Sequence, residues 1–294
     1  MLHALTFDIW EDVMTFKLGA AAAALILAAQ SVWAFEAQQK TVQNGAAEIS
    51  YNLRGSGPLI VILPSIGRAA GELAPVADGL AARGFSVALT EPRGIGGSTG
   101  PMEGVTFRDL AGDVAEVIRT EGGPAIIVGH AYGNWIAKTV AADHPDLARG
   151  VVILAAGAKN WPRALLNDIN TLNDPDAPRD AKLAALYSAF FTRDEDPEEW
   201  LQGWHSEVTE QQLAAMTATE RTDWWRGGDV PMLDLLAGED PFRPKDTWME
   251  TRDELGPRVT VKVIEGSSHA LPAAQPQKTA DAIADWAQSL DNPS

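Results

Sequence analysis

Cysteine is absent from the 294 residues of this chain. Its absence excludes disulfide bonds, thiolate nucleophiles and thiolate metal ligands. Positive charge is also scarce, because 23 lysines and arginines face 40 aspartates and glutamates and leave a net charge of −17. Nucleic acid and anionic lipid surfaces repel a chain of this charge, so we expect no nucleic-acid partner. The 5 histidines include no pair at metal-binding spacing, and we expect no metal site.

Long hydrophobic runs are scarce as well. The most apolar stretch, residues 18–29, would extend only about 18 Å as a helix, which is too short for a hydrocarbon core about 30 Å thick. It follows Lys17 and precedes a small-residue pattern that ends at Ala34, as in a secretory signal peptide. A start at Met14 would give this signal its usual basic leader. We therefore predict that residues 1–34 are a leader and signal peptide, that the protein is exported to the periplasm, and that no permanent membrane span remains.

The remaining chain alternates between apolar runs of strand length and amphipathic runs of helix length. This pattern predicts an α/β fold, with a mostly parallel sheet of about eight strands covered by helices on both faces. Predicted strands lie near 36–43, 47–53, 59–63, 86–91, 125–129 and 151–156, with two more beginning at Pro231 and Arg258. Predicted helices lie at 71–83, 107–120, 132–143 and 273–290.

The alternation stops after Gly157, and residues 161–230 are helical and aromatic in character. An insertion late in the sheet is the simplest account of this change. The sequence therefore predicts a core in two parts, 35–160 and 231–294, separated by a helical cap at 161–230.

The chemistry concentrates in residues 129–133, Gly-His-Ala-Tyr-Gly, between an apolar strand and an apolar helix. A strand-to-helix turn this tight strains its middle residue and needs glycine on both sides, because side chains there would collide with neighbouring elements. This pattern is typical of a nucleophile elbow.

At this point the chain resembles the α/β-hydrolase superfamily over about residues 37–290. Supporting segments are 91–98 after the fourth strand, 238–241 after the seventh and 266–269 after the last. The resemblance implies an α/β-hydrolase fold and a chain order of nucleophile, acid and histidine.

Ala131 occupies the nucleophile position of this elbow, where the superfamily carries Ser, Cys or Asp. A methyl group cannot attack a carbonyl, so a standard acyl-enzyme mechanism is excluded for the chain as written. Two explanations compete. One is a deliberate Ser→Ala replacement; the other, which the retained leader favours, is a natural member without the nucleophile.

His269 and Asp240 match the catalytic histidine and acid that the resemblance implies. A carboxylate on one ring nitrogen of a histidine fixes the tautomer and stabilises the cation. Glu239 is the adjacent alternative acid. Together His269 and Asp240 could still act as a general base on water or on a carbon acid, with no covalent step.

The resemblance also implies an oxyanion hole. One donor would be the backbone N–H of Tyr132, which follows the nucleophile position, and the other would come from the loop after the third strand. Pro64 in that loop has no N–H, so Ser65 or Ile66 would supply the second donor. The Ser65 hydroxyl is in addition an alternative, displaced nucleophile.

The cap carries the aromatic residues that we expect to wall a substrate pocket: Trp161, Trp200, Trp204 and Tyr187. Aromatic walls suit a small hydrophobic molecule. We expect no cofactor, because the glycines at 94 and 96 lack the third glycine of a dinucleotide-binding motif.

Three functions remain open on the sequence. The first is an enzyme that uses His269 and Asp240 as a general base on a small, mainly apolar molecule. The second is a non-catalytic binding protein on the hydrolase fold, and the third is a serine esterase-like hydrolase seen as a Ser→Ala variant. Retention of both His269 and Asp240 favours the first, because a pocket without chemistry needs neither.

Overall fold

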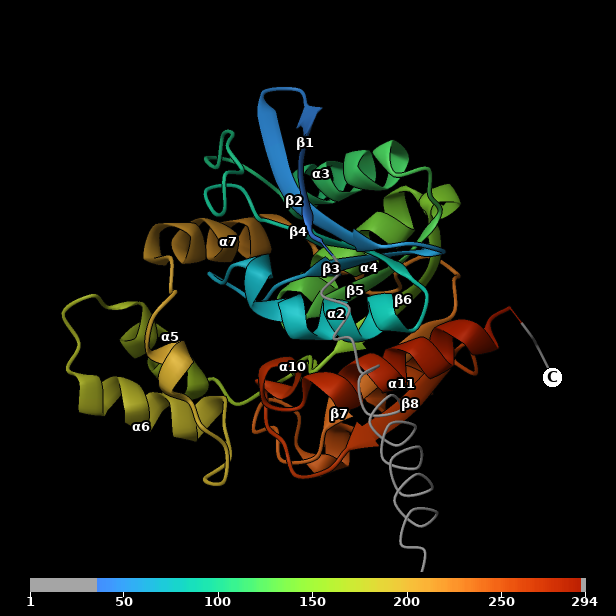
Figure 1. The fold of residues 1–294 in the computed structure, drawn as a ribbon. Helices are drawn as coiled ribbons and strands as arrows, with labels where there is room; N and C mark the ends of the chain where they lie inside the picture. Colours follow the sequence, from blue (N-terminus) through green and yellow to red (C-terminus); the bar gives the residue numbers. More distant parts are fainter. Residues whose placement is uncertain (1–35, 292–294) are drawn as a thin grey trace, which may run out of the picture. The chain divides into compact units, whose positions relative to one another are not determined.

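The computed structural model describes residues 36–291. The predicted leader and signal peptide lie outside these residues. Eight strands form one sheet in the order β1-β2-β4-β3-β5-β6-β7-β8 (Figure 1). The strands are β1 (Gln38–Asn44), β2 (Ala47–Gly55), β3 (Leu59–Leu63), β4 (Ser86–Thr90), β5 (Ala125–His130), β6 (Ala148–Leu154), β7 (Met232–Ala237) and β8 (Val259–Ile264).

The strands from β3 onward pair in parallel, whereas β2 pairs antiparallel with both β1 and β4. Every residue of β3, β5 and β7 is buried, because helices cover both faces of the sheet. Side chains of β3 alternate between the two faces: Val61 packs in one hydrophobic cluster and Ile60 in the other. This arrangement confirms the predicted α/β-hydrolase fold class with its mostly parallel eight-stranded sheet.

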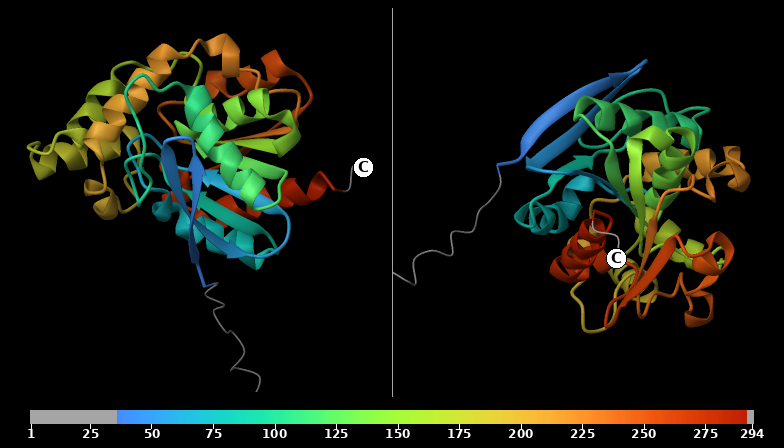
Figure 2. Two further views of the ribbon diagram at one scale, coloured as in Figure 1. Left: turned by 90° about the horizontal axis from the view of Figure 1, so that it is seen from above. Right: turned by 90° about the vertical axis from the view of Figure 1, so that its right-hand side faces the viewer.

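The two layers of helices follow from these clusters. Helices α3 (Phe107–Thr120) and α4 (Gly133–Asp143) pack on one face, and α2 (Ala74–Ala82) and α11 (Pro276–Ser289) pack on the other. Figure 2 shows the sheet between these two layers. The 3-10 turns η1 (Ala70–Leu73), η2 (Pro145–Leu147) and η4 (Lys245–Thr247) and helix α9 (Glu250–Leu255) lie in the connections. Among residues 36–291, none of the helices has the length and apolar character that a membrane crossing requires.

Most predicted bounds agree with the structure to within three residues, and two differ for local reasons. The predicted helix 71–83 opens as the 3-10 turn η1 before α2 begins. The predicted helix 273–290 is divided into α10 (Leu271–Ala274) and α11. Gln275 adopts φ −133° and ψ 61°, since the ring of the following Pro276 disfavours the helical conformation at the residue before it.

The segment between β6 and β7 is helical. It contains α5 (Leu165–Asn173), α6 (Arg179–Ala189), η3 (Glu198–Leu201), α7 (Ser206–Ala218) and α8 (Arg221–Trp224). Figure 1 shows α5 and α6 packed together beside the sheet rather than on either face. Their apolar side chains form a separate cluster that includes Phe242 and Ala270 of the core. Below, "the insert" means residues 161–230.

Candidate active site

The turn between β5 and α4 has the strained geometry that the sequence predicts. Ala131 adopts φ +46°, in the left-handed region that a non-glycine residue seldom occupies. A Cβ at Gly129 would collide with the backbone of Gly133, and one at Gly133 would lie 2.7 Å from the carbonyl oxygen of Pro64. The Ala131 N–H donates to the Leu154 carbonyl at 3.0 Å, so the turn is also tied to β6. The elbow is therefore fully formed although its central residue has no reactive group.

The predicted histidine and acid meet beside this elbow. Asp240 follows β7, His269 follows β8, and Nδ1 of His269 lies 2.8 Å from Oδ2 of Asp240. The other carboxylate oxygen, Oδ1, accepts the backbone N–H of Phe242 at 2.8 Å. Both side chains are buried, whereas Glu239, the alternative acid, is exposed. The geometry therefore selects Asp240 over Glu239.

The contact with Asp240 determines which ring nitrogen of His269 carries the hydrogen. An ionised carboxylate can only accept hydrogen bonds, so Nδ1 carries the hydrogen and Nε2 is the free, basic nitrogen. Within the described part of the chain, Nε2 has no hydrogen-bond partner. The ring lines the cavity described below, and so the basic nitrogen is available to a bound molecule or water.

Aromatic side chains and a second histidine fix the position of His269. Its ring centroid lies 4.2 Å from that of Phe242 and 5.5 Å from that of Phe190. Nε2 of His130 donates to the His269 carbonyl oxygen at 2.9 Å. Burial lowers the pKa of His130 to about 3, so this ring stays neutral near pH 7 and acts as a structural support.

A cavity of about 230 Å³ lies over the elbow. One water needs only about 10–15 Å³ of such space, so the cavity can hold a small organic molecule. The core contributes Ser65, Ile66, Ala131, Tyr132 and His269 to its wall. The insert contributes Trp161, Arg163, Leu166, Ile169, Leu213 and Met216, which are apolar apart from Arg163.

The predicted oxyanion donors also face this cavity. The backbone N–H groups of Ile66 and Tyr132 donate to no acceptor among residues 36–291, and both residues line the wall. The N–H of Ser65 likewise donates to no acceptor there and Ser65 also lines the wall, so Ser65 and Ile66 are both candidates for the second donor. Two unpaired N–H groups beside a basic histidine are the arrangement that stabilises a developing oxyanion.

Three of the four predicted pocket aromatics lie elsewhere, and this part of the prediction is wrong. Trp161 lines the cavity. Trp200 and Trp204, whose rings are nearly perpendicular, both contact Arg68 instead, with its guanidinium carbon 4.5 Å and 4.6 Å from their ring centroids. The guanidinium carbon of Arg193 lies 4.6 Å from the ring centroid of Tyr187. Their side chains contact cations, the buried Arg68 of the core and Arg193 of the insert, and such contacts with an aromatic face are favourable.

The structure adds three aromatic wall residues that sequence reasoning missed: Trp135, Phe190 and Phe242. A sequence signal exists for Trp135, because it lies four residues after Ala131 and so one helical turn beyond the elbow. Phe190 and Phe242 reach the cavity through the packing of the insert on the core, which no local pattern reveals.

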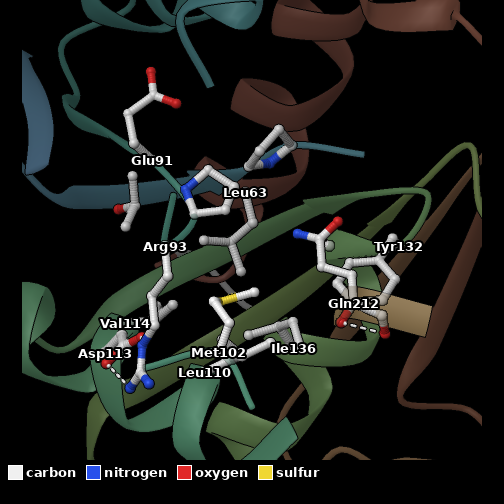
Figure 3. Close-up of a pocket in the computed structure, with 14 residues that line it drawn as sticks. Leu63, Glu91, Arg93, Met102, Leu110, Asp113, Val114, Tyr132, Ile136 and Gln212 are labelled. Carbon is white, nitrogen blue, oxygen red and sulfur yellow. Dashed lines mark hydrogen bonds and ion pairs between the residues drawn. The ribbon is translucent and has the colours of Figure 1, made fainter. Parts of the chain in front are cut away.

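A smaller cavity of about 50 Å³ also has Tyr132 in its wall (Figure 3). Among its charged groups, Arg93 forms two hydrogen bonds with Asp113, at 2.7 Å and 2.8 Å, and Glu91 accepts the backbone N–H groups of Ala70 and Gly71, at 2.7 Å and 3.0 Å. The Tyr132 hydroxyl donates to the Gln212 carbonyl at 3.2 Å, which links the elbow to α7 of the insert. Tyr132 thus connects this cavity, the elbow and the insert, and no histidine lines the cavity.

Within residues 36–291, no group of three or more His, Cys, Asp or Glu side chains is placed to hold a metal ion.

Comparison with known proteins agrees with this architecture. The chain is 27% identical over 263 residues to 2-(acetamidomethylene)succinate hydrolase of Mesorhizobium japonicum, covering 84% of this chain and 94% of that one. Its fold is similar to that of a bacterial membrane phospholipase A (TM-score 0.72, 18% identity, 95% of this chain and 94% of the other). It is also similar to that of an esterase from Thermogutta terrifontis (TM-score 0.71, 20% identity, 86% and 99%).

A family model described as the alpha/beta hydrolase family matches residues 60–282, which include the elbow, Asp240 and His269. Fold, site and family match agree, and the chain belongs to the α/β-hydrolase family.

Proposed function

We propose that this protein hydrolyses a small, mainly apolar substrate with water that His269 activates, and that no covalent enzyme intermediate forms. The observation that carries the proposal is the buried 2.8 Å contact between His269 and Asp240, with Nε2 left free toward the cavity. Hydrolytic relatives support the reaction class.

The reaction would run in two steps. Nε2 of His269 removes a proton from water while the water oxygen adds to the substrate carbonyl carbon. The carbonyl oxygen becomes an oxyanion, which the N–H groups of Tyr132 and of Ser65 or Ile66 stabilise. The intermediate then expels the leaving group, and this group takes the proton back from Nε2. Asp240 stabilises the imidazolium that exists between the two steps.

Ala131 leaves room for the attacking water. Where a nucleophilic residue would carry a hydroxyl or a carboxylate, this chain presents a methyl group to the cavity. The same His269 base could abstract a proton from a carbon acid or assist a lyase reaction, because both need only an oriented histidine.

A serine esterase-like function is the second candidate, and one observation favours it. Ala131 retains φ +46°, a conformation that costs about 1–2 kcal/mol and that exposes the side chain of a nucleophile when one is present. A serine at this position would need no further change of backbone. If neither chemistry operates, the protein is a binding protein that uses the same cavity.

Steady-state hydrolysis of a panel of small aromatic and aliphatic esters tests the proposal. We compare the parent with His269→Ala and use His144→Ala, at the far end of α4, as the matched control. The parent should turn over without an initial burst, and His269→Ala should lose about 10²–10⁴-fold in rate. A stoichiometric burst, or full activity in His269→Ala, would overturn the proposal. Cavity binding without any turnover would instead identify a binding protein.

We also propose that the protein is exported and that the mature chain begins at Phe35. The apolar run 18–29 and the small residues before position 35 support this. N-terminal sequencing of the protein from its native host should return Phe35. An intact Met1 or Met14 on cytoplasmic protein would contradict export.

A further inference from the structure

A second cavity of about 250 Å³ adjoins the one that contains His269. Three cationic residues line it, Lys159, Arg163 and Arg221, and its lining includes no aspartate or glutamate. This is unusual in a chain with a net charge of −17, where acids outnumber bases. Tryptophans form much of the remaining wall: Trp135, Trp161, Trp224 and Trp225.

Two of these cations are not neutralised by the described residues. Arg163 has no carboxylate partner among residues 36–291 and lies 5.0 Å from the ring centroid of Trp161. Arg221 likewise has no carboxylate partner there, and its Nη2 donates only to the Lys159 carbonyl, at 3.3 Å. Lys159 differs, because its Nζ lies 2.7 Å from Glu254. The guanidinium groups of Arg163 and Arg221 therefore have N–H donors in this cavity that no carboxylate of residues 36–291 accepts.

The two cavities are close enough for one molecule to occupy both. They share five lining residues, Trp135, Gly157, Trp161, Arg163 and Met216, so no more than one side chain separates them. The cavity with His269 is walled mainly by apolar groups, and the adjoining one is cationic. A ligand that fits both has an apolar part and an anionic end.

We propose that the second cavity is an anion-binding subsite for Arg163 and Arg221, and that the molecule bound over the elbow is an organic carboxylate with an apolar body. A planar guanidinium matches a carboxylate through two parallel hydrogen bonds, and flat indole walls suit a planar group. The assignment of this carboxylate as a substrate rests on the proposed function, whereas the anion subsite itself does not.

Titration of the full-length protein with hexanoate, and with hexanamide as its uncharged counterpart, tests the subsite. Quenching of the tryptophan fluorescence reports binding, because four tryptophans line this cavity. Hexanoate should bind at least about tenfold more tightly than hexanamide, and this preference should weaken as salt rises. In the double variant Arg163→Gln/Arg221→Gln the ratio of the hexanoate affinity to the hexanamide affinity should fall to about one. The affinity for hexanamide itself should stay unchanged.

Arg226→Gln is the matched control, since Arg226 pairs with Asp229 on the surface and does not line the cavity. It should keep the full preference for hexanoate. Equal affinity for acid and amide in the parent would overturn the proposal, as would an undiminished preference in the double variant. Arg163→Lys tests whether charge alone is sufficient, because lysine keeps the positive charge but lacks the planar guanidinium that forms two parallel hydrogen bonds. This variant should retain only part of the preference for hexanoate over hexanamide.

The two proposals fail separately. His269→Ala should keep the parent's preference for hexanoate over hexanamide, because His269 lines the cavity for the apolar body that both ligands share and does not line the cationic one. Hexanoate binding that depends on Arg163 and Arg221, together with an absence of His269-dependent turnover, would keep the subsite and reject the hydrolytic function. His269-dependent turnover without carboxylate preference would do the reverse.

Discussion

The cavity over the elbow has two walls of different construction. On the core side, hydrogen bonds fix the functional groups. Asp240 accepts a hydrogen bond from the ring of His269, and His130 donates one to the His269 carbonyl oxygen. The backbone N–H of Ala131 donates to Leu154 of β6. On the insert side the wall is apolar apart from Arg163, as at Leu166 and Met216. Under the proposed function, the core wall provides the reaction chemistry and the insert wall selects what enters.

The largest expected effect follows from this difference. Asp240→Asn should reduce kcat/KM by about 10²–10⁴-fold, because an amide can hold the wrong tautomer of His269 and cannot stabilise its cation. Leu166→Ala, on the insert wall, should change KM by different factors for substrates of different size. Its kcat should stay within about tenfold of the parent's kcat. Kinetics of both variants on one ester panel measure the contrast. A loss of kcat in Leu166→Ala as large as in Asp240→Asn would remove the distinction between the walls.

Phe190 joins the two walls, and its removal should cost stability. It is 1% exposed, and its ring packs near those of Trp200, Phe242 and His269. Phe190→Ala should lower the free energy of unfolding by about 3–5 kcal/mol, as for other buried phenylalanines. Urea unfolding monitored by tryptophan fluorescence gives this value. The half-exposed Leu166→Ala is the control and should lose less; equal losses would mean that Phe190 does not join the walls.

The effect that is smallest near neutral pH concerns His130, the support beneath the core wall. Burial lowers the pKa of His130 to about 3, so the folded protein binds fewer protons at this site than the unfolded chain between about pH 6.5 and pH 3. Stability must therefore fall as pH falls through that window, by up to about 1.4 kcal/mol per pH unit from this group. His130→Gln keeps a donor to the His269 carbonyl and should flatten the dependence by that amount.

Unfolding free energies of parent and His130→Gln at several pH values check this. The slope of the unfolding free energy against denaturant concentration should be the same in the parent and in His130→Gln. An equal slope shows that the substitution does not change the unfolded state. Parallel curves for the two proteins between about pH 6 and pH 4 would show that His130 is not a buried neutral group.

The core wall could be predicted from sequence because its signals are local. The glycines on either side of Ala131 mark the elbow, and the capping box of Thr106 and Asp109 fixes the start of α3 at residue 107. Asp240 and His269 each lie in the loop that follows a strand, β7 and β8 respectively. Pro276 was a local signal as well, and it explains why the last helix is divided at Gln275.

The insert wall could not be predicted in the same way. Tryptophans 161, 200 and 204 look equivalent in the sequence, yet only Trp161 reaches the cavity. The other two cover Arg68, a residue that is more than 130 positions earlier and is buried against η3 and α7 by the fold. Which way such a side chain faces depends on how helices distant in sequence pack together. Residue type alone carries no information on that choice.

The central claim is that the core wall is a working site that lacks only its nucleophile. Ala131→Ser tests it most directly, by restoring a hydroxyl on a backbone that already has φ +46°. The parent should not react with a fluorophosphonate probe. Ala131→Ser should label stoichiometrically, and Ala131→Ser/His269→Ala should not. A correctly folded Ala131→Ser protein that neither labels nor hydrolyses any ester would contradict the account.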